Sequence, residues 1–343
     1  MRRLLVPLVL LALILGGFWL GGESLLVRQL RAAAARHPML GLGEARELRD
    51  PGRFGIHARA VELRLQAGRI ELPQAELWLT PLHPTTLHLA LPSRAGFDPG
   101  SGSGSGFGAG PLDLGLGEAA ARLRLQPLGG MAMAAAGLSA GPLSLQGSAL
   151  AEALRVEALR VAPDRDDPAG AAAAYDFKLL LDDLDPVLLV PSPLPGRLDL
   201  AARGRVWLDA LPRPSALAAG LTPLPVGLRL DGAELRLGGL QARLMGRVEA
   251  DTQGRAQGRI MLYTRDAEPL LQAAAQAGLI PPRAVTLAGA MLRNISALPL
   301  SGDGGQEYPP PAEGELRLPL DLAAGRTRLG PITLGPAPAF PRR

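Results

Sequence analysis

The residues that could perform chemistry are few and scattered in this chain. Its histidines are His37, His57, His83 and His88, and it contains no cysteine. Thiolate nucleophiles, iron–sulfur clusters, disulfides and cysteine-ligated zinc are therefore excluded. His83 and His88 lie five residues apart in a region of alternating apolar and polar residues, so we expect them on opposite faces of a strand. The histidines do not predict a metal site.

Acidic residues cluster at Asp182, Asp183 and Asp185. The spacing, the glycine and the terminal glutamate of a calcium-binding EF-hand loop are missing, and Pro186 makes Asp185 a good helix cap instead. The chain also lacks a nucleophile elbow, an H-E-x-x-H motif and a Walker motif. We therefore expect no catalytic, cofactor-binding or metal-ligating residues, no bound cofactor, and a protein that is not an enzyme.

The composition argues against nucleic acid as a partner. The chain of 343 residues has 36 Lys+Arg, 32 Asp+Glu and a formal charge of +4, and only 3% of its residues are aromatic. Nucleic-acid binding normally needs a clustered basic surface or aromatic stacking platforms. Lys178 is the only lysine, so the arginine excess is interpreted as coding bias from a GC-rich genome.

The first residues predict a membrane anchor. Arg2 and Arg3 precede an uncharged apolar run over 4–20, which as a helix would reach roughly 26 Å and, with two following glycines, approach the ~30 Å hydrocarbon core of a bilayer. A cleaved signal peptide is the alternative, but the run is long for one and no small-x-small site follows it directly. The expected anchor residues are Leu4, Leu5, Leu8, Leu11, Ile14, Phe18, Trp19 and Leu20.

The charges flanking this run predict its orientation. Two arginines and the terminal amine favour a cytoplasmic N-terminus by the positive-inside rule. We thus expect a single-pass protein of the inner membrane with its body in the periplasm. Residues 23–36 have strong helix formers and no glycine or proline, so we expect them to extend the anchor helix.

After residue 50 the hydrophobic period becomes two, which is typical of half-buried antiparallel strands. Glycine and proline, 43 and 33 residues, mark many strand ends. The expected fold class is mainly β with a few helices (α+β), in which a transmembrane helix is followed by antiparallel sheets of many short strands, curved or groove-forming. The expected strands lie at 61–65, 70–72, 76–79, 86–91, 112–116, 122–125, 143–145, 154–156, 159–161, 177–179, 198–200, 205–208, 228–230, 235–237, 243–250 and 258–263.

Helices are expected only at a few places. A proline start and a glycine end predict one at 268–278, and others are expected at 186–190 and at 283–297. Residues 251–255 predict a hairpin turn in which Gly254 adopts a positive φ.

The expected domains are an anchor with its juxtamembrane extension at 1–36 and an exported body at 37–343. Residues 99–111 are rich in glycine and serine and predict a flexible loop, since no strand–loop–helix context supports phosphate binding. A polar stretch at 163–174 divides the body near its middle, so the body is expected to consist of one sheet system, with two similar halves as an option.

The C-terminal residues carry a resemblance to a known family. The run over 321–338 resembles the closing signature of an alphaproteobacterial family called domain of unknown function 2125, with supporting similarity at 73–78 and 235–258. That family implies placement in the envelope and provides no catalytic residues. The matching residues are Gly325, Arg326, Leu329, Gly330, Pro331, Ile332, Leu334, Gly335, Pro336 and Pro338.

A fold-level likeness to AsmA-like envelope proteins lies in the anchor followed by many alternating strands, as at 196–206. It implies curved sheets whose apolar face holds lipid. The sequence therefore favours a non-catalytic protein of envelope maintenance that binds lipid or another apolar ligand on a leucine-rich sheet face. The alternative is a scaffold or assembly subunit that binds a membrane-protein partner.

Overall fold

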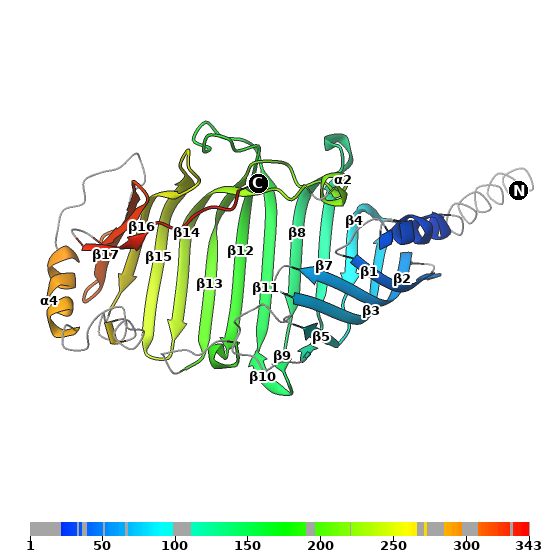
Figure 1. Ribbon diagram of the computed structural model, residues 1–343, viewed down its shortest axis with the longest axis horizontal. Coiled ribbons are helices and arrows are strands. Elements are labelled where there is room, and N and C mark those ends of the chain that lie inside the picture. The colour runs from blue at the N-terminus through cyan, green and yellow to red at the C-terminus, as the bar shows by residue number, and fades with distance from the viewer. Residues whose placement is uncertain are drawn as a thin grey trace, which may run out of the picture. The chain divides into compact units, whose positions relative to one another are not determined.

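The computed structural model confirms a mainly β protein with antiparallel strands and few helices (Figure 1). It divides into two compact units, Met1–Ala149 with Pro214–Gly220 (unit 1) and Leu150–Arg213 with Leu221–Arg343 (unit 2). The structure describes residues 22–32, 34–35, 40–50, 52–65, 68–98, 111–189, 196–219, 221–265, 271–272, 285–296, 308–329 and 332–342.

The predicted anchor at 4–20, the loop at 99–110 and most of the predicted helix at 268–278 lie outside the described residues. Among the described helices, none is long and apolar enough to cross a membrane.

Unit 1 is an antiparallel sheet that branches at one strand. The first part of β3 pairs with β5 and its last part pairs with β4, so one branch continues through β7 and β8 and the other through β6 and β9. The strands of the unit are β1 (Leu40–Glu47), β2 (Phe54–Leu65), β3 (Gly68–Thr80), β4 (His83–Ala90), β5 (Arg94–Asp98), β6 (Leu112–Leu116), β7 (Ala120–Gln126), β8 (Ala132–Ala140) and β9 (Leu143–Leu145), with short helices η1 (Pro127–Gly129) and α2 (Pro214–Ala218).

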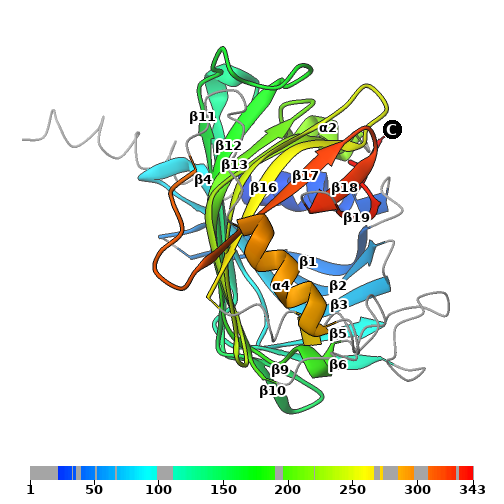
Figure 2. The ribbon, with the colours of Figure 1, turned by 90° about the vertical axis from the view of Figure 1, so that its left-hand side faces the viewer.

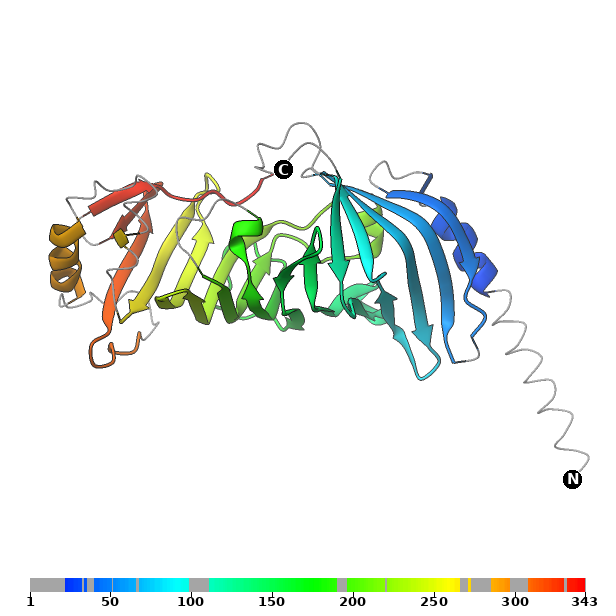
Figure 3. The same ribbon diagram turned by 90° about the horizontal axis from the view of Figure 1, so that it is seen from below.

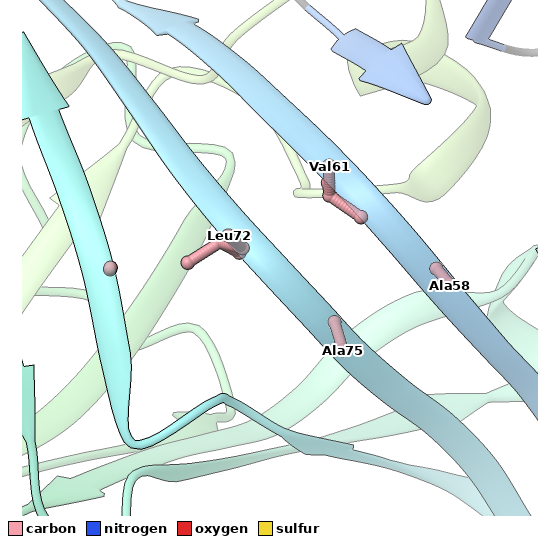
Figure 4. Close-up of a cluster of buried hydrophobic side chains, with 5 residues drawn as sticks. Ala58, Val61, Leu72 and Ala75 are labelled. Atoms are coloured by element: carbon pink, nitrogen blue, oxygen red, sulfur yellow. The ribbon is translucent and has the colours of Figure 1, made fainter. Parts of the chain in front are cut away.

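A matched irregularity keeps the core of unit 1 continuous. Ala58 pairs with Ala75 and Val61 pairs with Leu72, so two residues instead of one separate the buried positions on each strand. Ala60, one of them, takes a φ of 50°. Residues three apart on each strand therefore point to the same side. All four side chains are buried in one apolar cluster (Figure 4).

Unit 2 is a meander in which each strand pairs with the next along the chain. β10 (Ser148–Ala151) begins in unit 1 and ends with the first residues of unit 2. The remaining elements are β11 (Ala153–Val161), β12 (Ala173–Leu184), η2 (Pro186–Leu188), β13 (Leu198–Leu208), β14 (Pro225–Leu237), β15 (Leu240–Ala250), β16 (Ala256–Thr264), α4 (Val285–Ser296), β17 (Leu316–Ala323), β18 (Arg326–Leu329) and β19 (Ile332–Pro336).

The sheet of unit 2 is curved, with α4 on the inner side of the curve (Figure 2). Leu292 of α4 packs against Leu318 of β17, and both are buried, with Leu262 of β16 beside them. The helix thus covers leucine side chains of the last strands of the sheet.

The opposite face of unit 2 carries a cross-strand row of arginines. Arg205, Arg229, Arg247 and Arg259 lie directly opposite one another on β13 to β16. Like charges in directly opposed positions repel each other. Each arginine forms an ion pair with its own carboxylate, from Asp176, Asp231, Glu249 and Asp321 respectively. The positive charge of each arginine in the row is therefore balanced by its own carboxylate.

Several sequence predictions are confirmed within the described residues. The helix expected at 283–297 is α4, and the turn expected at 251–255 joins β15 to β16 with Gly254 at a φ of 76°. The Asp185 side chain accepts a hydrogen bond from the Val187 amide at 3.1 Å and so caps η2.

The predicted short strands 112–116 and 143–145 are confirmed as β6 and β9, but elsewhere the prediction of short strands was wrong. Segments predicted as pairs of short strands, such as 228–230 and 235–237, are single strands, here β14 of 13 residues. The pairing of β14 with β15 shifts between Leu230 and Ala233, so a bulge interrupts the alternation without ending the strand.

Candidate functional site: an apolar cavity under the first helix

A helix over residues 22–32 packs on the beginning of the sheet of unit 1 (Figure 3). Val27 is buried against Ala45 of β1 and Ile56 of β2, with Leu30 at the edge of the same cluster. Glu23 is also fully buried. These positions are four and three residues apart, which places Glu23, Val27 and Leu30 on one side of the helix.

Polar contacts hold the start of this helix in place. The carboxylate of Glu23 accepts hydrogen bonds from the backbone amides of Gly55 at 3.0 Å and Arg49 at 3.3 Å. The Ser24 hydroxyl donates to Glu47 at 2.8 Å. The pKa of Glu47 is lowered, first by a hydrogen bond from its own backbone amide and then by Ser24.

The other end of the helix is fixed to β1. The Arg31 guanidinium donates a hydrogen bond to the carbonyl of Ala45 at 2.7 Å. Ala45 lies on β1, whose described pairing is with β2. Arg31 therefore occupies a backbone acceptor of this strand, which is one way in which proteins protect exposed sheet edges.

Between the helix and the sheet lies a cavity of about 340 Å³, which we call the helix cavity. Gln29 is the one polar side chain among the described residues that line it. The apolar lining residues are Leu26, Leu30, Phe54, Ile56, Leu77, Trp78, Leu79 and Leu87.

The chemistry of the helix cavity suits an apolar ligand. Its volume lies at the lower end of the range of roughly 300–1,000 Å³ for small-molecule sites. Binding sites lined mainly by apolar and aromatic side chains accept apolar molecules. Leu26, on the helix, is 36% exposed, so the cavity wall borders solvent at this residue.

The C-terminal residues singled out in the sequence form an edge hairpin in unit 2. Gly325 has a φ of 73° in the turn between β17 and β18, and Arg326 begins β18. Leu329 packs beside the Leu318 cluster, and Leu334 is 55% exposed. Ile332, Gly335 and Pro336 belong to β19, whereas Gly330 and Pro331 lie outside the described residues.

The residues that follow this hairpin form hydrogen bonds with the start of β16 and with the turn before it. The carbonyl of Pro338 accepts a hydrogen bond from the Ala256 amide at 2.7 Å, and the Phe340 amide donates to the carbonyl of Gly254 at 2.7 Å. A cavity of about 330 Å³ lies beside it, lined by Gly325, Arg326, Thr333, Gly335 and Pro336.

The acidic cluster borders a third cavity, also in unit 2. Asp182 and Asp183 lie with Asp199, Glu152 and Glu234 around a volume of about 380 Å³. The Asp183 amide donates to the Asp199 carboxylate at 2.9 Å. Asp185, in contrast, acts as the cap of η2.

Sequence reasoning did not find the helix cavity. The signal that could have found it is the spacing of Glu23, Val27 and Leu30, which places these three residues on one face of the predicted helix. Such a face can pack on the sheet. Leu26 and Gln29 on the adjoining face then line the cavity.

The fold and this cavity define an antiparallel β protein with an apolar site next to its first described helix. Its family is shown by comparison with known proteins. The chain belongs to the family described as "Uncharacterized protein conserved in bacteria (DUF2125)", whose model matches residues 51–338. This match confirms the resemblance noted at the C-terminus. No curated protein and no solved structure matches the chain.

Proposed function

We propose that this protein is a non-catalytic, membrane-anchored protein of the bacterial cell envelope that binds a lipid acyl chain in the helix cavity. The observation that carries the proposal is the apolar lining of this cavity, which comes from the helix immediately after the predicted anchor at 4–20 and from β2, β3 and β4. An acyl chain leaving the bilayer would meet this site first.

The predicted topology supports the same function. A cytoplasmic N-terminus and a periplasmic body would place unit 1 next to the outer surface of the inner membrane. Likeness of the strand pattern to AsmA-like envelope proteins agrees with lipid binding by analogy. A fusion of alkaline phosphatase to the C-terminus tests the topology, since the enzyme is active only when it is exported.

Photocrosslinking tests the ligand. The full-length chain is reconstituted in nanodiscs that contain a phospholipid with a diazirine on one acyl chain, and the labelled peptides are identified by mass spectrometry. We expect labelling at the cavity residues of β2 and β3, in addition to the anchor.

A matched pair of variants makes this test specific. Leu26→Trp adds volume at a lining residue, whereas Leu25→Trp adds the same volume to a neighbour that is 52% exposed and does not line the cavity. We expect Leu26→Trp to lower cavity labelling about tenfold, which corresponds to about 1.4 kcal/mol, and Leu25→Trp to leave it unchanged. Equal labelling in the two variants would contradict the proposal, and labelling of the anchor peptide serves as the internal standard.

A scaffold function is the second candidate, favoured by the exposed Leu334 on β19. Within the described residues β19 pairs with β18 alone, and an extended segment of a partner could add to such a strand. Crosslinking in cells from position 334 tests this function. A single protein adduct there would support it, and no adduct would count against it.

A further inference from the structure

Two hairpins of unit 1 expose large apolar side chains at their tips. Leu82, in the turn between β3 and β4, is 87% exposed, and Leu128, in η1 between β7 and β8, is 100% exposed. Met131, at the end of the second turn, is 46% exposed. We call Leu82, Leu128 and Met131 the apolar tips. Single exposed leucines are common on protein surfaces, whereas several that lie together mark an interaction site.

Strand pairing brings the two hairpins together. β4 pairs antiparallel with β7, from Thr86 opposite Arg124 to Ala90 opposite Ala120. β8 continues the sheet beyond β7, so the three strands lie side by side (Figure 1). Because adjacent strands are about 4.8 Å apart and β4 and β7 run in opposite directions, the turn before β4 and the turn after β7 are neighbours at one edge of the sheet.

The tips of both hairpins lack charged side chains. Residues 77–93 and 125–151 contain no aspartate, glutamate, lysine or arginine. Such turns can enter the boundary between lipid headgroups and acyl chains without burying a charge. Arg124, four residues before Leu128, is exposed, and a basic residue in this position is attracted to the phosphates of anionic lipids.

The helix over residues 22–32 begins at the same edge of the sheet. Phe54, the first residue of β2, pairs with Leu79 of β3, three residues before Leu82. A Cβ atom added to Gly22 would lie 2.7 Å from Phe54 Cζ, so the start of the helix touches the start of β2. Gly22 comes two residues after the predicted anchor at 4–20. The chain would therefore leave the membrane next to the edge that carries the apolar tips.

We propose that the apolar tips dock on the surface of the lipid bilayer from which the anchor emerges, with their side chains at the boundary of the acyl chains. This inference rests on the membrane anchoring in the proposed function. The two hairpins add contacts beside the anchor and so fix the orientation of unit 1 on the membrane. Phe54 and Leu79 line the helix cavity at this edge, so docking holds the cavity at the lipid surface.

Fluorescence quenching by lipid tests this docking. The chain contains no cysteine, so a single introduced cysteine can carry an environment-sensitive fluorophore on the full-length chain. The labelled chain is reconstituted in nanodiscs of phosphatidylethanolamine and phosphatidylglycerol, with a nitroxide near the headgroup end of one acyl chain. We expect about threefold stronger quenching at Leu82→Cys and Leu128→Cys than at Leu138→Cys, because only the tips reach the acyl boundary.

Leu138 is the matched control for these positions. It is 36% exposed and lies on β8, seven residues after Met131. Seven residues of strand span roughly 20 Å, so a fluorophore at this position stays away from a bilayer that the tips contact. Equal quenching at positions 82, 128 and 138 would overturn the docking.

A label in the predicted anchor separates this inference from the proposed function. Phe18→Cys should be quenched whenever the anchor spans the nanodisc. Quenching at position 18 without quenching at position 82 or 128 would overturn the docking and leave the anchoring intact, and no quenching at position 18 would overturn both. The nanodiscs contain only lipid and this chain, so tips that dock on another protein would remain unquenched.

A charge variant tests whether the two hairpins share one surface. With the fluorophore at Met131→Cys, Leu82→Asp adds a charge to the neighbouring hairpin, whereas Leu138→Asp adds the same charge to the strand of the reporter, away from its tip. We expect Leu82→Asp to reduce quenching about threefold and Leu138→Asp to leave it unchanged, because aspartate is unfavourable in the membrane. Both positions are exposed. Equal quenching in the two variants would overturn the shared docking surface.

Discussion

The buried carboxylate of Glu23 accepts a hydrogen bond from the backbone amide of Gly55 at 3.0 Å, which ties the first described helix to β2. Both residues are buried. A buried amide without an acceptor costs more than the hydrogen bond itself contributes. The helix and the sheet of unit 1 are therefore coupled at this contact.

Replacing Glu23 should loosen the helix from the sheet. In Glu23→Ala the amide of Gly55 loses this acceptor, and we expect the free energy of unfolding to fall by about 1–3 kcal/mol. Urea unfolding measures this change, and limited proteolysis at residues 36–39 reports release of the helix. Glu23→Gln keeps one acceptor oxygen and should lose less. Equal losses in both variants would argue that the charge, not the hydrogen bond, stabilises the contact.

Removing a carboxylate from the arginine row should destabilise unit 2. Asp321→Asn leaves Arg259 without its ion pair to Asp321 while Arg247 still lies opposite it. We expect a loss of about 1 kcal/mol that becomes smaller in high salt, because this ion pair is partly exposed and salt screens it in part. Glu313→Gln, at an exposed turn, is the control. A loss independent of salt would contradict this electrostatic explanation.

Two glycines with the same φ separate backbone strain from side-chain crowding. Gly314 and Gly325 both have a φ of 73°, but an added Cβ atom meets nothing within 4 Å at Gly314 and lies 2.7 Å from Arg255 Nη1 at Gly325. Arg255 is held by an ion pair with Asp251 at 3.0 Å, so its displacement disrupts this pair.

Both glycine-to-alanine changes should therefore cost stability. We expect about 1 kcal/mol for Gly314→Ala from the backbone alone, and a greater loss for Gly325→Ala. Thermal unfolding of the two variants, compared with the unchanged protein, measures the difference. If Gly314→Ala were the more destabilising of the two, Arg255 would not be the cause.

Alkaline pH should weaken unit 2 through its buried tyrosines. Burial raises the pKa values of Tyr175 and Tyr263 above the ordinary value of 10.0. Their neutral forms are thus favoured in the folded state, so the stabilisation is present below the unfolded pKa and is lost as the pH rises through the folded pKa.

Urea unfolding from about pH 9 to about pH 11 measures this loss. Tyr263→Phe removes a hydroxyl that donates to the Pro309 carbonyl at 2.8 Å. We expect this variant to be less stable at neutral pH and to show a smaller decrease in stability at alkaline pH. A decrease as large as that of the unchanged protein would exclude Tyr263 as a source of the pH dependence.

Period-two alternation and turn residues predicted most strands, the turn at Gly254 and the helix α4. They failed where alternation breaks inside a strand, as at Ala60, because the φ of 50° at this residue changes which side chains face the core. They also missed β8, whose run of alanines has low β propensity. Pairing of β8 with β7 outweighs that propensity.

The candidate sites, too, were predicted only in part from the sequence. Local sequence patterns were enough to predict the mainly β class, the cap at Asp185 and the family residues at the C-terminus, because each of these depends on residues that are neighbours in the chain. Only the tertiary structure brought Leu26 to Phe54 and Leu79 around the helix cavity, and stacked Trp78 on His88. These contacts depend on strand register and on helix docking, which join residues distant in sequence and leave no local pattern.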